Sequence, residues 1–251
     1  MKNGTYVYGV VEGQRAPSLG AAPAGLAGAG RPRALAVKPG RWVVAADVPL
    51  ERYGEESLAR GLRDLDWVGG CALAHEGVVE YLARRGPVVP MKLFTIFHND
   101  ERAIDHVARA RGTLDRAFRR IADAAEWSVR VFRSETAAGS PRGAIAAARS
   151  GAEFLREKKR ERDTARARVV AATSAAETAH RALKKIARGS VVKPPMEGEA
   201  GARLIVDAAY LVPNDRRAAF RTEATRQAGR CRRAGCTLTL TGPWPAYHFI
   251  A

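Results

Sequence analysis

The last stretch of the chain places the tightest limits on the fold. From Cys236 to Thr241, threonine alternates with leucine, and this period of two is typical of a strand with one buried face. The run 242–249, Gly-Pro-Trp-Pro-Ala-Tyr-His-Phe, follows at once, and its prolines end the strand. Chain ends usually fray, so a terminus rich in aromatic side chains is expected to dock on a core. The fold must therefore contain a sheet that receives this strand and a core that receives the tail.

Composition and charge indicate a folded protein with an acidic partner. Hydrophobic residues make up 46% of the 251 residues, which is enough to build a core. The 42 Lys and Arg against 26 Asp and Glu give a net charge of +16, which favours contact with nucleic acid, an anionic membrane or another acidic partner. The excess lies mainly in the second half, because residues 126–251 hold 24 basic and 12 acidic residues.

The sequence gives no sign of export, membrane insertion or metal binding. It has no run of eighteen apolar residues and no signal peptide at its start, so we expect a cytoplasmic protein without membrane association. The three cysteines, Cys71, Cys231 and Cys236, form no CxxC pair, which fits a reducing compartment. A zinc site made by Cys231, Cys236 and His248 is an alternative, but this spacing is loose. We therefore expect no metal and no other cofactor.

Patterns along the chain predict an α+β fold with two domains. Strands are expected at 6–11, 34–37, 42–48, 93–97, 126–132, 203–212 and 237–241, and helices at 55–67, 72–84, 100–124 and 218–235, with two or three more in 143–188. The predicted domains are an N-terminal α+β domain, 1–125, and a C-terminal domain, 126–251, with a helical insertion at about 143–188.

Three local patterns make sharper predictions. Leu58, Leu62 and Leu65 recur at three- and four-residue spacing, which predicts the apolar stripe of an amphipathic helix. Gly69-Gly70 is predicted to separate that helix from the next. Segment 12–31 is rich in Ala, Gly and Pro and poor in large apolar residues, so we expect it to be mobile.

No catalytic arrangement is found. His75-Glu76 lacks the second histidine of an HExxH motif, and neither a phosphate-binding loop nor a GxSxG turn occurs. His98 with Asp100, or Asp64 with Asp66, are alternatives for acid–base work, although short carboxylates at a helix start more often cap the helix. We therefore expect a protein that is not an enzyme.

Two groups of side chains are candidates for contact with a partner. The first is the set of exposed cations in the predicted helical insertion: Arg156, Lys158, Lys159 and Arg160. These residues also allow an alternative function, a nucleic-acid-binding module that uses the basic helices in 143–188. Acidic neighbours such as Glu157 and Glu161 would repel a phosphate backbone, and no known recognition motif is present, so nucleic acid is the weaker hypothesis. The second group is Tyr247 and Phe249, because aromatic side chains are frequent in binding hot spots, whereas Trp244 is expected to cover the edge of a core.

Six short blocks occur in one order along the chain: Tyr6–Val11, Leu62–Trp67, Ala74–Val79, Val89–Met91, Glu126–Val131 and Leu240–Phe249. In this order they resemble the gas vesicle protein F/L family (GvpF/GvpL), and the Gly-Pro-Trp-Pro run is the most specific part. The matching residues are expected to be mainly structural: Trp67, His75, Glu76, Pro90, Glu126, Trp127, Gly242, Pro243, Trp244 and Pro245.

The resemblance implies a function and a fold. The function is that of a non-enzymatic accessory protein for gas vesicle assembly, which binds the hydrophobic shell protein GvpA and other accessory proteins. The fold is an N-terminal α+β domain followed by a C-terminal modified ferredoxin-like domain with extra helices. The resemblance leaves open an F-type or L-type role and the oligomeric state.

Overall fold

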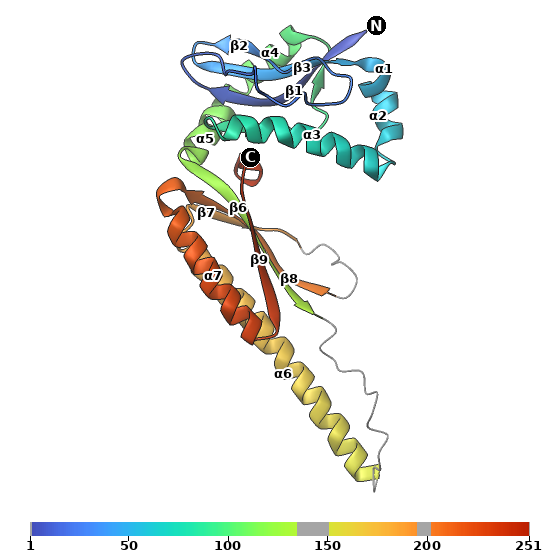
Figure 1. Cartoon of the computed structure of the whole chain (residues 1–251), viewed down its shortest axis with the longest axis vertical. Coiled ribbons are helices and arrows are strands. Elements are labelled where there is room, and N and C mark those ends of the chain that lie inside the picture. Colours follow the sequence, from blue (N-terminus) through green and yellow to red (C-terminus); the bar gives the residue numbers. More distant parts are fainter. Residues whose placement is uncertain (1, 135–150, 195–201, 251) are drawn as a thin grey trace. The chain divides into compact units, whose positions relative to one another are not determined.

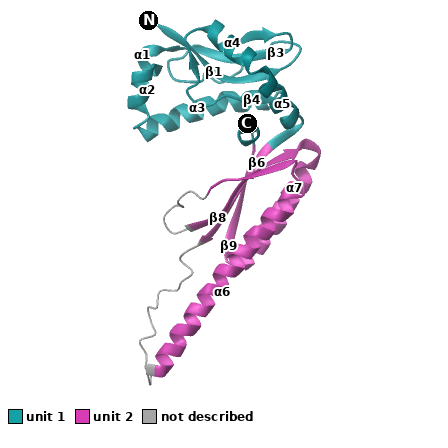
Figure 2. Cartoon of the chain, turned by 180° about the vertical axis from the view of Figure 1, so that it is seen from behind, with its two compact units in different colours: residues 1–125, 244–251 teal, residues 126–243 magenta. Residues whose placement is uncertain are grey.

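The chain folds into two compact units. The computed structural model describes residues 2–134, 151–194 and 202–250. The first unit comprises residues 1–125 and 244–251, and the second comprises residues 126–243 (Figure 2). The division after residue 125 coincides with the expected domain boundary. The aromatic tail, however, belongs to the first unit and not, as the sequence suggested, to the second.

The first unit is a five-stranded sheet with helices packed on it (Figure 1). Its central strand, β1, pairs antiparallel with β3, β4 and β5, and β2 pairs with β3. The elements are β1 (Asn3–Glu12), β2 (Arg33–Lys38), β3 (Arg41–Pro49), α1 (Leu50–Tyr53), α2 (Glu55–Gly61), α3 (Leu65–Ala83), β4 (Val88–Pro90), β5 (Ile96–Phe97), α4 (Asp100–Arg109), α5 (Arg111–Ile121) and the single-turn η3 (Tyr247–Phe249).

Helices cover both faces of this sheet. Tyr6 and Tyr8 of β1 point to one face, where they join a core with α3 residues such as Val78. The residues between them point the other way, because side chains alternate along a strand. On that face Thr5 bonds to Asp100 at the start of α4, and Arg41 pairs with Asp115 of α5. Burial on both faces explains why β1 is apolar at almost every position.

Two predicted helix boundaries are wrong. Asp64 caps α3, since its Oδ1 accepts from the backbone N–H groups of Asp66 and Trp67 at 3.0 and 3.1 Å. The helix therefore starts at Leu65 and runs through Gly69-Gly70 without a break, because the cap and the packing of α3 outweigh the low helix propensity of glycine. The helix expected over 100–124 is two helices that meet at Ala110.

The glycine-rich segment between β1 and β2 is fixed by tyrosines. Leu26 within it is only 2% exposed. Three buried tyrosine rings each place a hydroxyl group on its backbone: Tyr8 accepts from the N–H of Leu26 at 3.2 Å, Tyr53 donates to the carbonyl of Ala27 at 2.8 Å, and Tyr81 donates to the carbonyl of Ser18 at 3.0 Å. The prediction that nothing orders this segment is therefore wrong, because the tyrosines that do so lie far away in the sequence.

The second unit is a four-stranded sheet in the order β7-β8-β6-β9, with two helices on one face. Trp127, Val129 and Val131 of β6 point to these helices. The elements are β6 (Ala124–Ser134), α6 (Gly151–Lys184), β7 (Gly189–Val192), β8 (Ala202–Pro213), the single-turn η2 (Asn214–Arg216), α7 (Arg217–Arg233) and β9 (Cys236–Trp244).

The predicted insertion differs in detail from the structure. Within the described residues it is one helix, α6, which continues past Thr173-Ser174, and the part of the prediction at 143–150 lies outside them. The segment 191–201, with Pro194-Pro195 and Gly198, is typical of a linker, but it begins inside a strand, since β7 pairs antiparallel with β8. Residues 195–201 of that linker also lie outside the described chain.

Gly242 is required where β9 passes β6. Its φ of +123° lies in a region that side-chain-bearing residues rarely adopt, and a Cβ there would lie 2.9 Å from the carbonyl oxygen of Glu126 and 3.3 Å from the Cα of Trp127. Both contacts are with backbone, which cannot move aside cheaply. Gly242 is therefore a requirement of close strand packing.

Gly242→Ala is expected to lower the free energy of unfolding by about 2 kcal/mol or more, because it adds steric overlap to backbone strain. The matched control is Gly235→Ala. Gly235 also has positive φ, +79°, but open space around its missing side chain, so the expected loss is nearer about 1 kcal/mol. Urea denaturation of both variants measures the difference, and an equal loss would show that the overlap at Gly242 is unimportant.

Candidate functional site

The C-terminal tail is anchored inside the first unit. The Tyr247 hydroxyl donates to Glu76 Oε2 at 2.6 Å. Phe249 is fully buried, and the Arg120 guanidinium lies 5.5 Å from the centre of its ring. The expectation that Phe249 offers a contact to a partner is therefore wrong, because its ring fills the unit's own core. Tyr247 is partly exposed, with its hydroxyl already used internally.

His75 and its neighbour Glu76 hold two different segments to α3. Tyr6 Oη lies 2.6 Å from His75 Nδ1, and the Tyr8 ring stacks on the imidazole with 5.6 Å between ring centres. His75 is 4% exposed, and this burial lowers its pKa to about 4, so the ring is neutral near pH 7. His75 thus fixes β1 while Glu76 fixes the tail.

Trp67 and Pro90 also have structural surroundings. The Trp67 ring is stacked on Phe94 with 5.4 Å between ring centres, and a Cβ on Gly61 would lie 2.6 Å from it. Pro90 is buried in β4 opposite Gly9 of β1. These residues shape the core beneath α3.

The remaining signature residues lie where β6 begins and β9 ends. Glu126 and Trp127 are 3% and 6% exposed, next to the close approach of Gly242. Pro243 ends the second unit. In the first unit Pro245 is buried, whereas Trp244 keeps 37% of its surface exposed.

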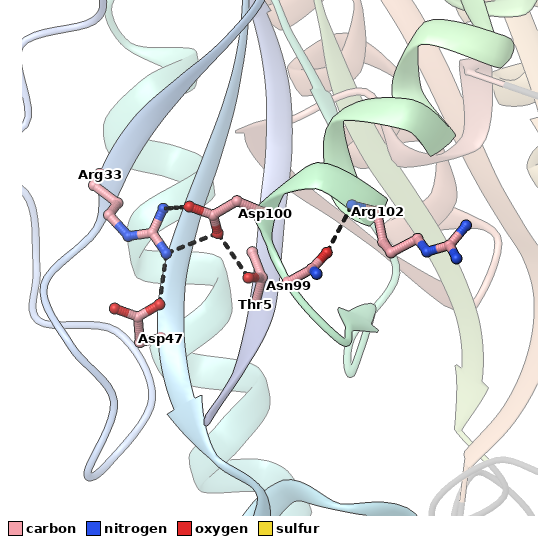
Figure 3. A network of polar contacts seen from close by, with 6 residues as sticks. All are labelled: Thr5, Arg33, Asp47, Asn99, Asp100 and Arg102. Atoms are coloured by element: carbon pink, nitrogen blue, oxygen red, sulfur yellow. Dashed lines mark hydrogen bonds and ion pairs between the residues drawn. The ribbon is translucent and has the colours of Figure 1, made fainter. Parts of the chain in front are cut away.

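The polar residues considered for acid–base work are used in structural bonds. Figure 3 shows Arg33 holding Asp100 through both carboxylate oxygens, at 2.7 and 2.8 Å, and reaching Asp47 at 2.5 Å. Thr5 donates to the same carboxylate at 2.7 Å. The bond from Arg33 holds the pKa of Asp100 below its usual range, so the carboxylate stays charged and acts only as an acceptor.

A helix cap and a small hollow adjoin this network. Asn99 caps α4 by accepting from the backbone N–H of Arg102 at 3.0 Å (Figure 3). The hollow beside it, about 390 Å³, is lined by His98 and the same polar residues. The Asp64 carboxylate caps α3 and the Asp100 carboxylate bonds Arg33, so one carboxylate of each pair proposed from sequence is held in a bond within the fold.

The cysteine pair of the second unit is buried. Cys236 Sγ lies 3.3 Å from the carbonyl oxygen of Cys231, and burial raises the pKa of Cys236 to about 12. A thiol that stays protonated is a poor metal ligand. Over residues 2–134, 151–194 and 202–250, no three His, Cys, Asp or Glu side chains gather as a metal site would require.

α6 consists of a packed half and an exposed half. Ala172, Ala176, Ala179 and Leu183 are fully buried against the sheet, at the spacing of one helix face. Residues 152–171, which we name the α6 arm, are exposed throughout. Four of the residues predicted to contact a partner lie on this arm: Arg156, Lys158, Lys159 and Arg160.

Charge on the α6 arm is mixed, with a basic excess. The arm carries seven basic and four acidic residues. Glu153, Glu157 and Glu161 recur every four residues and line one side of the helix. Lys158 pairs with Glu161 at 3.0 Å. A helix with such an acidic line suits a protein surface of mixed charge better than a phosphate backbone.

Comparison with known proteins places the chain in a family. The model of the gas vesicle synthesis protein GvpL/GvpF family matches residues 4–251. The chain belongs to this family. It is also 29% identical over 252 residues to gas vesicle protein L of Streptomyces sp. (strain CB03234), covering 97% of this chain and 91% of that protein.

Two crystal structures of family proteins share the fold. GvpF from Anabaena sp. PCC7120 superimposes with a TM-score of 0.69 at 16% identity and covers 99% of this chain and 98% of its own. GvpF from Microcystis aeruginosa gives a TM-score of 0.63 at 14% identity and covers 99% of each chain. The mixed α/β fold with two antiparallel sheets is thus common to GvpF and this family member.

The leucines around the start of α3 form an exposed surface of this GvpL/GvpF family member that the sequence pattern did not predict. Leu62 and Leu65, predicted to lie on a buried stripe with Leu58, are 55% and 83% exposed. The cause is the interruption at Asp64, because a new helix starts there and the phase of the stripe set by α2 is lost. The spacing of the leucines does not indicate this interruption. Asp64 does, because aspartate is a frequent N-cap residue.

Across the part of the chain that the structure describes, no helix is both long and apolar enough to span a bilayer.

The lowered pKa of His75 predicts a pH dependence of stability. The unfolded chain binds a proton near pH 6.5 and the folded chain only near pH 4, so this contribution is complete above pH 6.5 and is lost as the pH falls from there towards 4. Between pH 7 and pH 5 the loss is on the order of 2 kcal/mol.

His75→Gln keeps hydrogen-bonding capacity without this titration. Urea denaturation at pH 7 and pH 5 should therefore show a smaller difference for the variant than for the wild type. Equal differences would assign the pH dependence to other groups, such as His180, whose pKa burial also lowers.

Proposed function

We propose that this chain is a non-enzymatic accessory protein of gas vesicle assembly, which binds the shell protein GvpA and other accessory proteins at the growing vesicle in the cytoplasm. The observation that supports this most is the family match, which extends over residues 4–251. The use of Asp64, His75 and Asp100 in structural bonds is consistent with a binding role. Over the described residues, the surface carries exposed helical segments, such as residues 152–171 of α6.

Assembly of a gas-filled shell creates a need for such a protein. Shell subunits that exclude water must expose apolar surface before they join the lattice, and exposed apolar surface aggregates. A binding protein that covers this surface reversibly would keep subunits available. Its own affinity must stay modest, because the lattice has to compete for the subunit.

We infer that the second unit is a modified ferredoxin-like domain that follows an N-terminal α+β domain. The order of its main elements is β6-α6-β7-β8-α7-β9, which is the β-α-β-β-α-β arrangement of that fold. Its sheet order, β7-β8-β6-β9, places the first and third strands in the centre. The extra helical length is the α6 arm, which extends the first helix of the fold beyond the sheet.

We assign the contact with other accessory proteins to the α6 arm, through Arg156, Lys158, Lys159 and Arg160. The arm contributes nothing to the core of its own unit, since its residues are exposed. Ordering a solvated helix has an entropic cost. Contact with another protein would explain why the chain keeps this helix. Nucleic-acid binding by the same helix remains an alternative outcome of the test below.

The proposal predicts that deletion of the gene from a vesicle-forming cluster abolishes gas vesicles and that the wild-type gene restores them. The tagged protein should retain GvpA when the two are co-expressed. Electron microscopy counts the vesicles, and a chain carrying only the tag controls for non-specific retention of an apolar subunit. Normal vesicle numbers in the deletion strain would contradict the proposed function.

A variant with Gln at four positions of the α6 arm, Arg156, Lys158, Lys159 and Arg160, tests this assignment. The amount of accessory protein that co-purifies with it should fall several-fold, without a change in its melting temperature. The control removes the same charge from exposed positions of α7: Arg221, Arg230, Arg232 and Arg233. Equal losses for the two variants would assign the effect to net charge. Retention of DNA by the wild type at low salt, lost steeply as salt rises, would favour the nucleic-acid alternative.

A further inference from the structure

Three large apolar side chains, one just before α3 and two in its first half, are exposed in the described structure. Leu62, Leu65 and Leu73 are 55%, 83% and 77% exposed. Single exposed leucines are common on protein surfaces, but several together mark a contact surface. This group therefore needs an explanation outside the fold of its own unit.

Leu65 and Leu73 lie on the same side of α3 because of helical geometry. Leu65, Gly69, Ala72 and Leu73 follow the spacing that places residues on one side of a helix, and the buried Cys71, His75 and Val78 lie on the other. Leu62 lies two residues before Asp64, the cap of the same helix. We name Leu62, Leu65, Gly69, Ala72 and Leu73 the α3 face.

The centre of the α3 face is flat and lacks side chains. Gly69 and its neighbour Gly70 are exposed, and nothing lies within 4 Å of the position that a Cβ would take on either. Glycine inside a helix is less stable than alanine by about 0.5–1 kcal/mol. The fold of this unit gives no reason for that cost, whereas a helix packed from outside would gain close approach of the two backbones.

The segment that carries the α3 face has a net charge opposite to that of the whole protein. Residues 55–80 hold six carboxylates and two arginines, a net charge of −4, in a chain of +16. Asp66 lies beside the leucines, and Glu55 and Glu56 lie on α2. In the described structure none of these three has an ion-pair partner within 4 Å. A ligand for this surface should therefore combine apolar and cationic groups.

We propose that the α3 face binds an amphipathic α-helix of a partner protein, in which an apolar stripe is flanked by Lys or Arg. The leucines supply the apolar contact, the glycines allow the helices to approach, and the carboxylates select the charge of the flanks. That the partner is a gas vesicle protein rests on the proposed function. The chemistry of the surface rests on this chain alone.

The same features disfavour other occupants. An anionic lipid surface would be repelled by the carboxylates at the rim. An extended strand needs a sheet edge to pair with, and the α3 face is the side of a helix. A second copy of this chain is a distinct outcome that the experiment separates.

Two synthetic 18-residue peptides test the proposal with the full chain. Both carry a leucine stripe on an alanine helix, with lysines at its flanks in one and glutamates in the other. We expect the lysine peptide to bind at least tenfold more tightly in fluorescence anisotropy. Net charge alone predicts the opposite, because a +16 protein attracts the glutamate peptide. Tighter binding of the glutamate peptide, or no binding of the lysine peptide, overturns the proposal.

Variants locate the binding. The double variant Leu65→Ser, Leu73→Ser should bind the lysine peptide at least tenfold more weakly. The control is Leu155→Ser, at a leucine of the α6 arm that is 69% exposed, and it should leave the affinity for the peptide unchanged. Gly69→Ala should raise the urea midpoint of the free protein and still weaken the binding of the lysine peptide several-fold. Equal losses for the α3 and α6 variants would overturn the proposal, as would unchanged binding by Gly69→Ala.

Two further outcomes separate this proposal from others. A dimer in sedimentation that Leu73→Ser dissociates would identify a second copy as the occupant and overturn the partner proposal. Normal vesicles in the deletion strain, with intact selectivity for the lysine peptide, would remove the proposed function and support the docking surface. Loss of vesicles on deletion without lysine-peptide binding would support the function and overturn the docking surface.

Discussion

The first unit depends on the need to pair the hydroxyl groups of buried tyrosines. Burying a tyrosine ring stabilises a core, but an unpaired hydroxyl there costs about 1–3 kcal/mol. Tyr6 meets this need through His75 of α3, and Tyr8 and Tyr53 meet it through the backbone of the segment before β2. These bonds therefore fix both the rotation of α3 and the course of a glycine-rich segment. A neutral His75 is part of the same constraint, because its Nδ1 bonds a buried hydroxyl.

The rotation of α3 about its axis determines which of its side chains are exposed. Once Cys71, His75 and Val78 face the sheet, the geometry of a helix sends Leu65, Gly69 and Leu73 outward. The exposed leucines are thus a consequence of core packing at positions where polar residues would serve solubility better. That conflict between local sequence and local environment is the usual mark of a binding surface.

Much of the fold could be predicted from sequence where the signal is local. The period of two in β9 and the apolar runs of β1 and β8 locate strands, and the mixed α/β class follows from their order. The failures have a common cause, namely that tertiary contacts outweighed local preference. Gly69-Gly70 is helical because the cap at Asp64 and the packing of α3 hold it. The segment before β2 is ordered by tyrosines remote in sequence, and Phe249 is buried by a core that the tail alone did not reveal.

The two halves of α6 have different surroundings, because one half packs on the sheet and the other is exposed. The alanine stripe from Ala172 to Leu183 holds the helix on the sheet, and small side chains there let it lie close. Toward the start of the helix, the same side continues with Val169 and Ala165, which are exposed, and then with Glu161 and Lys158, so the helix leaves the core. The arm is then stabilised by helix propensity and by pairs such as Lys158 with Glu161, each of which contributes only a few tenths of a kcal/mol. Such a helix keeps its shape without support from the core, which is what the contact proposed for the α6 arm requires.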